Sequence, residues 1–299
     1  MKEVVRIRRI VIDTDIGDDI DDALAIVLAL NSPELDLAGL TTVYRNTGLR
    51  TKLALQLLKA YGRLDIPVAT GIGSPLINKT DTASIPCQWA EEYRDIDLNC
   101  EQHAADFLID QVRRDPDLTI VAIGPLTNIA CAVMKAPEVM RGANIVMMGG
   151  MHSAFYPEWN IVCDPEAARI VFDAGLKLTM IGLDVTLQCR LTQADVDRIK
   201  RAGRMETDFL SRLITMWMDS SKHLPILHDP LTVAYLSHPD LLDLAPKKIS
   251  VECKGEFTRG MTVEHRDVFF DRPMETNVLA AVEVKSEAFI QLFLQRLLK

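Results

Sequence analysis

Six aspartates lie within ten residues near the start of the chain, at Asp13, Asp15, Asp18, Asp19, Asp21 and Asp22. Carboxylates this close repel one another and raise each other's pKa unless a cation neutralises them. Helix capping explains one or two acidic residues at a helix start, and Asp18 or Asp19 is a candidate for it, but capping does not explain six. Carboxylate oxygens are hard ligands, which favours Ca²⁺ or Mg²⁺ over Zn²⁺. The segment therefore predicts a divalent-metal site in an enzyme active site.

The residues on either side of this segment predict the elements that position it. Residues 9–13 form a short apolar run typical of a buried strand, and residues 22–30 form an apolar stretch long enough for a helix. Gly17 permits a tight turn between the two. Ligands of open α/β sheets bind beyond the carboxyl ends of the strands, and Asp13 and Asp15 lie at such an end.

Apolar strands and helices continue to alternate as far as residue 181. We predict strands at 37–43, 66–70, 118–123, 145–148 and 178–181, and helices at 49–61, 103–113, 128–134 and 165–173. Strands that are apolar throughout and joined by helices are typical of a parallel sheet covered on both faces. Because the sequence shows no linker or internal repeat, we predict an α/β fold: a single domain over residues 1–299, with an open, mostly parallel central sheet flanked by helices.

The later part of the chain is less regular. Residues 192–236 are predicted to be mainly helical, and 249–252 and 260–264 to be strands of a hairpin or an edge addition. Residues 286–298 are predicted to form an amphipathic closing helix. Residues 71–99 are the least regular stretch, and we expect them to form a long loop near the site.

The composition excludes some classes of partner. A formal net charge of −9 argues against a nucleic-acid backbone or an anionic membrane, and it is compatible with a cation site. No apolar stretch approaches the ~20 residues of a membrane span. The 6 cysteines are scattered without metal-binding spacing, which predicts reduced thiols in a cytoplasmic protein.

Two familiar acidic motifs fit the aspartate segment poorly. An EF-hand loop requires an acidic residue or Asn two positions after Asp15, where Gly17 stands. The strand–DxDx(T/V) pattern of haloacid-dehalogenase-type phosphatases matches Asp13 and Asp15, but Gly17 again stands where Thr or Val is expected. A phosphatase is therefore the most distant of the alternatives.

Residues 13–25, DTDIGDDIDDALA, resemble the N-terminal DxDxxxDD signature of the inosine/uridine-preferring nucleoside hydrolase family. Other segments resemble the family in the same order: TTVYRN at 41–46, AIGPLTNIA at 122–130, PEWNIVCDPEAA at 157–168, HDPLTVA at 228–234 and TRGMTVE at 258–264. A single DxD match is weak evidence, whereas ordered matches along nearly the whole chain are strong. The resemblance implies cleavage of the N-glycosidic bond of ribonucleosides to ribose and free base, with a bound Ca²⁺.

The resemblance also implies which residues hold the metal. Asp15 would be a metal ligand and the general base that takes a proton from the metal-bound water. Asp22 would be a bidentate ligand, and Asp229 would close the site from far along the chain. The main-chain carbonyl of Ile123, before the GPLTN turn, would add another oxygen, and a backbone ligand explains why Ile is tolerated there.

The substrate contacts follow in the same way. Asp21 would hold ribose hydroxyls, Glu158 and Asn160 the 5′ side of the sugar, and Asn46 the ribose or the acidic cluster. His228 is either the proton donor to the leaving base or a residue that orients Asp229, and the sequence leaves both readings open. The implied partner is a small nucleoside, with no nucleic acid and no membrane, and a homodimer or homotetramer is expected.

Three features depart from the family pattern. The turn after Gly17 is two residues longer than the common form, so Asp19 or Asp21 takes the ribose role, and the DDALA register favours Asp21. His152 stands nearest the place of an Asn that contacts ribose, so either it substitutes or that contact is lost. The 71–99 loop lacks an HGxDG-like segment, and Trp89 or Tyr93 is a candidate to stack on the nucleobase.

These departures leave three functional readings beside the phosphatase. The first is a Ca²⁺-dependent ribonucleoside hydrolase. The second is hydrolysis of a different riboside by the same residues, because the base pocket looks remodelled. The third is a non-catalytic homologue that binds metal and ribose, which the presence of a candidate general base argues against.

Overall fold

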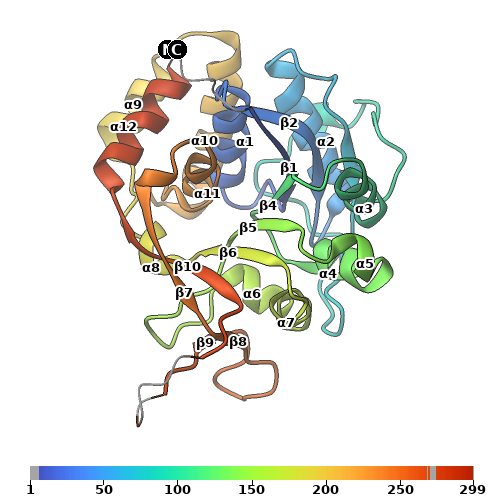
Figure 1. Ribbon diagram of the computed structural model, residues 1–299. Helices are drawn as coiled ribbons and strands as arrows, with labels where there is room; N and C mark the ends of the chain where they lie inside the picture. Colours follow the sequence, from blue (N-terminus) through green and yellow to red (C-terminus); the bar gives the residue numbers. More distant parts are fainter. Residues whose placement is uncertain (1–6, 268, 270–273, 299) are drawn as a thin grey trace, which may run out of the picture.

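A computed structural model describes residues 7–267, 269 and 274–298 of the chain. At its centre is an 8-stranded sheet with the strand order β3-β2-β1-β4-β5-β6-β10-β7. Neighbouring strands run parallel, except that β10 and β7 are antiparallel at one edge. The predicted α/β fold, an open and mostly parallel sheet flanked by helices, is confirmed (Figure 1).

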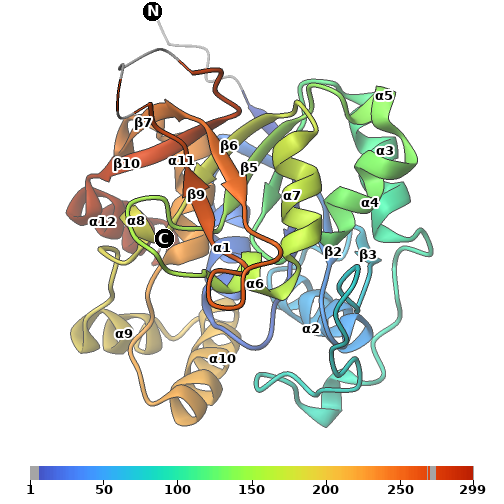
Figure 2. The same cartoon turned by 90° about the horizontal axis from the view of Figure 1, so that it is seen from below.

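The sheet has the following strands: β1 (Arg8–Thr14), β2 (Leu35–Thr42), β3 (Val68–Thr70), β4 (Thr119–Ala122), β5 (Asn144–Met148), β6 (Lys177–Ile181), β7 (Leu242–Lys247) and β10 (Val278–Val284). One face is covered by α1 (Asp21–Leu30), α2 (Thr47–Ala60), α10 (Met205–Ser221), α11 (His228–Ser237) and α12 (Ser286–Leu297). The other face is covered by α3 (Ala104–Arg114), α4 (Thr127–Lys135), α5 (Pro137–Met140) and α7 (Pro165–Asp173). Figure 2 shows the sheet from a second direction.

The apolar strands contribute side chains to two separate hydrophobic cores, one on each face of the sheet. In β1, Ile10 and Ile12 pack with the α1 and α11 layer, whereas Val11 packs with the α3 and α4 layer. This alternation follows from the two-residue period of a strand, which sends successive side chains to opposite faces. Burial on both faces explains why the strands are apolar throughout.

The strand order creates a place for a ligand. From β1 the chain builds outward through β2 and β3 on one side, and then through β4, β5 and β6 on the other. The carboxyl ends of β1 and β4 therefore flank the point where the order reverses, where open α/β sheets bind their ligands.

The predicted strands and helices are present, with ends shifted by a residue or two. Residues 192–236 are largely helical, with α9 (Gln193–Lys200) before α10 and α11, and β8 (Ile249–Val251) pairs with β9 (Thr262–Glu264) as an antiparallel hairpin. The loop 71–99 is irregular apart from one short turn of helix, Glu91–Tyr93.

Two strands of the sheet, β7 and β10, were not predicted from the sequence. β7 contains Pro246, which argues against a strand in general but is tolerated on an edge strand such as this one. β10 (VLAAVEV) combines three valines, which favour a strand, with two alanines, which do not, and it is held by pairing with β6 and β7. Within the described residues, no helix combines the length and apolarity needed to cross a membrane.

Candidate active site

A cavity of about 840 Å³ opens beyond the carboxyl ends of β1, β4 and β5. One part of its lining is acidic and consists of Asp15, Asp18, Asp19, Asp21, Asp22, Glu158 and Asp229. Another part is apolar or aromatic and consists of Met148, Met151, Ala154, Phe155, Tyr156, Trp159, Leu183 and Leu187. Arg45, Ile123, Asn160 and His228 complete the lining. The volume suits a small-molecule ligand, and the two-part lining suits one with a polar and an apolar portion.

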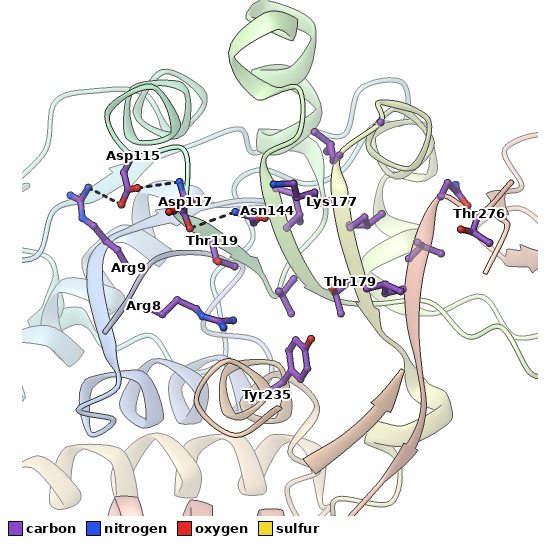
Figure 3. Close-up of a pocket in the computed structure, with 18 of the residues that line it drawn as sticks. Arg8, Arg9, Asp115, Asp117, Thr119, Asn144, Lys177, Thr179, Tyr235 and Thr276 are labelled. Atoms are coloured by element: carbon purple, nitrogen blue, oxygen red, sulfur yellow. Dashed lines mark hydrogen bonds and ion pairs between the residues drawn. The ribbon is translucent and has the colours of Figure 1, made fainter. Parts of the chain in front are cut away.

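A second hollow, of about 950 Å³, lies at the opposite edge of the sheet (Figure 3). It is lined from the amino ends of strands, for example by Arg8 of β1, Asn144 of β5 and Lys177 of β6, together with Tyr235 of α11. The carboxylate cluster lies at the other edge, where α/β proteins place their chemistry. The first cavity is therefore the candidate active site.

The first turns of α1 and α11 bring three buried carboxylates together. One oxygen from each of Asp21, Asp22 and Asp229 lies within 4.8 Å of the other two. The Asp229 backbone N–H donates to Asp21 (3.3 Å), and the Thr14 hydroxyl donates to Asp22 (2.5 Å). The structure therefore brings together residues that lie more than two hundred positions apart in the sequence.

Asp13 and Asp15 extend this acidic region from the end of β1. Asp13 is fully buried and accepts hydrogen bonds from the Thr41 hydroxyl (2.5 Å) and the Asn128 amide (2.8 Å). Its Oδ2 atom has no hydrogen-bond partner within the described part of the chain. A Cβ at Gly124 would lie 2.9 Å from Asp15 Oδ1, which explains the glycine in the GPLTN turn.

Burial controls the protonation of these carboxyls. It raises the pKa of Asp13 to about 7 and that of Asp15 to about 6, and neighbouring carboxylates add to both effects. Burial and then mutual repulsion raise the pKa of Asp21, Asp22 and Asp229 well above the ordinary aspartate value. Such a cluster must hold protons or a cation at neutral pH. Its all-oxygen donor set, with an orphaned buried oxygen on Asp13, fits a hard divalent cation.

Arg50 of α2 is a fully buried cation that the sequence analysis missed. Its guanidinium donates to the backbone carbonyls of Tyr44 and Ile16 (2.8 Å each) and to that of Asp15. It also donates to the Asp18 carboxylate (2.7 Å). Arg50 thereby fixes the start of the acidic turn. A signal was present in the sequence, because Arg50 shares one face of its helix with the apolar residues Ala54 and Leu57.

Replacing Arg50 with Met is expected to lower the free energy of unfolding by about 3 kcal/mol, because several buried carbonyls lose their donor. Arg45→Met is the matched control: Arg45 shares the Asp18 carboxylate (3.1 Å) but is partly exposed. Its expected loss is below about 1 kcal/mol. Urea denaturation measures both variants, and equal losses would contradict the structural role of Arg50.

Glu158 and Asn160 hold the loop between β5 and α6 (Trp159–Cys163) against the sheet. The Glu158 carboxylate accepts the backbone N–H groups of Gly150 (3.0 Å), Asn160 (2.9 Å) and Ile161 (3.2 Å). The Asn160 amide donates to the carbonyl of Ile123 (3.2 Å). Glu158, Asn160 and Ile123 all line the cavity, so both predicted sugar contacts lie in its lining.

His228, the first residue of α11, lies in the cavity lining next to Asp229. Its Nδ1 atom is 2.7 Å from the Thr186 hydroxyl, so this nitrogen is engaged away from Asp229. Burial, followed by the charge of Arg190, lowers the pKa of His228 to about 4. The imidazole is therefore neutral at pH 7 and offers a hydrogen bond rather than a positive charge.

Two predicted substrate contacts do not reach the cavity. Asn46 instead caps α2, and its side-chain oxygen accepts the Leu49 backbone N–H (3.2 Å). The His152 ring is buried between the carboxylates of Asp184 and Glu264, behind the cavity lining. The structure brings neither side chain into the cavity lining, because each makes an anchoring contact elsewhere.

The proposed aromatic stack on the nucleobase is also absent from the cavity lining. Tyr93 is buried and packs edge-on against Trp89, with ring centroids 5.6 Å apart. Tyr93 also contacts Phe209 of α10 (5.8 Å). These rings anchor the 71–99 loop to the core, so the expectation that Trp89 or Tyr93 stacks on the base is wrong. Phe155, Tyr156 and Trp159 lie in the lining instead.

The lengthened turn after Gly17 is held by the irregular loop. The Gln88 backbone N–H donates to the Gly17 carbonyl (3.0 Å), and the Gln88 amide donates to the Asp19 carbonyl (2.5 Å). The Asp19 carboxylate accepts the adjacent Ile20 N–H (2.6 Å), whereas Asp21 lies within the carboxylate cluster. The geometry therefore favours Asp21 over Asp19 for a ligand contact beside Asp22.

The fold and the cavity together define an α/β enzyme whose acidic site lies at the strand-order switch point. A family model described as inosine-uridine preferring nucleoside hydrolase matches residues 10–291. The chain belongs to this family, and it is a hydrolase that acts on N-glycosyl bonds.

Individual relatives match over nearly their whole length. Probable uridine nucleosidase 2 of Arabidopsis thaliana is 34% identical, with 98% of this chain and 98% of the relative covered. The structure of a plant nucleoside hydrolase has a TM-score of 0.85 at 31% identity, covering 97% and 99% of the two chains. The purine-preferring ribonucleoside hydrolase from Gardnerella vaginalis has a TM-score of 0.80 at 32% identity, covering 97% and 98%.

Proposed function

We propose that this protein hydrolyses the N-glycosidic bond of ribonucleosides to ribose and free base in a Ca²⁺-dependent reaction. The observation that carries the proposal is the two-part cavity. Its buried acidic part is suited to a polyhydroxylated sugar that becomes cationic, and its aromatic part is suited to a flat nucleobase. His228 is also in the lining, where it can donate a hydrogen bond to the leaving base.

The oxygen ligands of Ca²⁺ would be the carboxylates of Asp15, Asp22 and Asp229 and the backbone carbonyl of Ile123. Calcium is favoured over zinc because each of these donors is a hard oxygen. When bound, the cation lowers the pKa of a water molecule and orients it. Asp15, at the end of β1, would accept the proton that this water loses.

The remaining acidic residues would act on the sugar. Asp21 would hold the ribose hydroxyls, and Glu158 and Asn160 the 5′ side. Cleavage of the C–N bond develops positive charge on the sugar ring, as in other glycoside hydrolyses. Buried carboxylates aimed at the ring stabilise that charge more strongly than water does.

His228 would donate a hydrogen bond to the departing base. Replacing it with Leu is expected to lower kcat for nucleosides by about 10²-fold, because Leu has no N–H group to donate to the departing base. A riboside with a nitrophenol leaving group needs no such help, and its kcat is expected to change by less than about threefold. Equal losses with both substrates would instead assign His228 to orienting Asp229.

A substrate panel tests the proposed activity. The relatives named above include a uridine nucleosidase and a purine-preferring hydrolase, so the panel contains both purine and pyrimidine ribonucleosides. Free base and reducing sugar are measured with and without EDTA. We expect equimolar base and ribose from at least one nucleoside, and loss of the activity with EDTA. No ribose from any nucleoside would overturn the proposal and would favour a different riboside as substrate.

The assembly and the cellular location are separate proposals. We expect a homodimer or homotetramer, as the family resemblance implies, which light scattering of the purified protein checks. The 6 cysteines are unpaired, which supports the predicted cytoplasmic location. Cell fractionation with an antibody against the protein tests it.

A further inference from the structure

The segment 151–157, between β5 and α6, forms one wall of the cavity. We call it the aromatic wall, because Phe155 and Tyr156 lie at its tip and line the cavity together with Met151 and Ala154. The tip has little packing of its own, since Phe155 is 88% and Tyr156 56% exposed. The position of the wall therefore depends on how its base is anchored.

The backbone at the base of the wall is held by two buried side chains. The Thr262 hydroxyl accepts the Met151 N–H (2.9 Å) and donates to the Met151 carbonyl (2.8 Å). The Asp184 carboxylate accepts the backbone N–H groups of His152 (3.1 Å) and Ser153 (2.8 Å). These contacts tie the wall to β9 and to α8 (Leu183–Thr186), which lie far away in the sequence.

The side chain of His152 fills the slot between these two elements. The side chain is only 6% exposed: Nε2 lies 3.3 Å from the Ala281 carbonyl of β10 and 3.8 Å from Asp184, and Nδ1 lies 3.7 Å from Glu264. Glu264 also binds Arg266 (2.6 Å) and Lys247 (2.9 Å), and these hydrogen bonds lower its pKa to about 2. The ring thus sits between two carboxylates, one of which also orders the wall backbone.

We propose that His152 is a positioning residue that, with Asp184 and Glu264, holds the aromatic wall in place to bind the leaving nucleobase. The inference rests on the proposed nucleoside hydrolysis. It also explains the departure of this chain from the family pattern. His152 stands near the position of the expected ribose contact, but its side chain turns away from the cavity and supports the wall that would bind the base.

The kinetic consequence is specific. The wall belongs to the segment between β5 and α6, whereas the clustered carboxylates belong to α1 and α11, so releasing the wall should remove contacts to the base and leave the cleavage chemistry in place. Contacts made equally in the ground state and the transition state affect KM rather than kcat. Ribose, which has no base, should bind as before.

The experiment compares His152→Gln with His265→Gln. His265 lies at the end of β9, next to Glu264, and its ring contacts Ser250 (2.9 Å), which makes it a matched control. For His152→Gln we expect KM for a nucleoside to rise about tenfold, with kcat and inhibition by ribose changed less than about twofold. Chymotrypsin cleavage after Phe155 should accelerate about fivefold or more. His265→Gln should change none of these.

A second variant covers the case in which His152→Gln does not fold. Thr262→Val removes both hydrogen bonds to Met151 at nearly constant volume, and the same pattern is expected. Unchanged KM and cleavage in both variants, or equal changes in His265→Gln, would overturn the proposal. If the wild-type protein hydrolysed no nucleoside, the proposed function would fail, and the cleavage rates would still decide whether His152 anchors the wall.

Discussion

Replacing Asp15 with Asn is expected to lower kcat for nucleoside hydrolysis by about 10³-fold, within the range typical for loss of a general base. The amide nearly preserves the shape of the carboxylate but cannot accept the proton from water. The folded protein should survive the change, because burial already disfavours the ionised form and raises the pKa of Asp15 to about 6. Initial-rate kinetics with the preferred nucleoside measures the effect, and thermal unfolding checks the fold.

Asp36→Asn is the matched control for this variant. Asp36 lies on the neighbouring strand β2 but pairs with Arg9 at the other edge of the sheet (3.7 Å), and its side chain is 55% exposed. Its kcat should equal that of the wild type. If Asp15→Asn kept more than about a tenth of wild-type activity, Asp15 would not be the general base.

Removal of the metal should destabilise the protein, and more strongly at higher pH. Burial raises the pKa of Asp15, a proposed calcium ligand, from 3.8 to about 6, so between these values the folded metal-free protein binds more protons than the unfolded chain. The free energy of unfolding of the metal-free protein should therefore fall as pH rises from about 4 to about 6. Calcium replaces those protons, so its stabilising effect should be larger at pH 8 than at pH 5.

The size of this effect follows from binding linkage. Calcium at about 1,000 times its Kd should stabilise the fold by about 4 kcal/mol, which corresponds to a rise in Tm of about 8 °C. Differential scanning calorimetry of the metal-depleted protein at both pH values measures it. In Asp229→Asn the calcium-dependent rise should largely disappear. If calcium left the Tm of the wild-type protein unchanged at both pH values, the assigned metal site would be contradicted.

The sequence predicted well which strand and helix position the acidic site, because strand ends and helix starts are local features of a sequence. The apolar run of β1, Gly17 and the DDALA helix start placed Asp15 and Asp22 beyond the sheet. The approach of Asp229 to Asp22 is non-local and followed only from the family resemblance. The structure explains it by the packing of α1 against α11, whose first turns carry the two residues.

The contacts that anchor the site could not be predicted in this way. Arg50 and His152 act through partners whose closeness depends on the assembled sheet: Asp18 for Arg50, and Asp184 and Glu264 for His152. A polar residue at a motif position, such as His152, is therefore predicted from the sequence to contact the ligand, even where its side chain points away from the cavity. The same limit applied to β10, a short segment whose place in the sheet depends on pairing with β6 and β7.

The most direct test of the account is the rate of ribose release from metal-depleted protein titrated with Ca²⁺, using a nucleoside identified by the panel. We predict negligible release without metal and full recovery as about one calcium ion binds per chain, with little recovery in Asp22→Asn or Asp229→Asn. Full activity in the metal-depleted wild-type protein would contradict the central claim, as would recovery in both variants at the same calcium concentration.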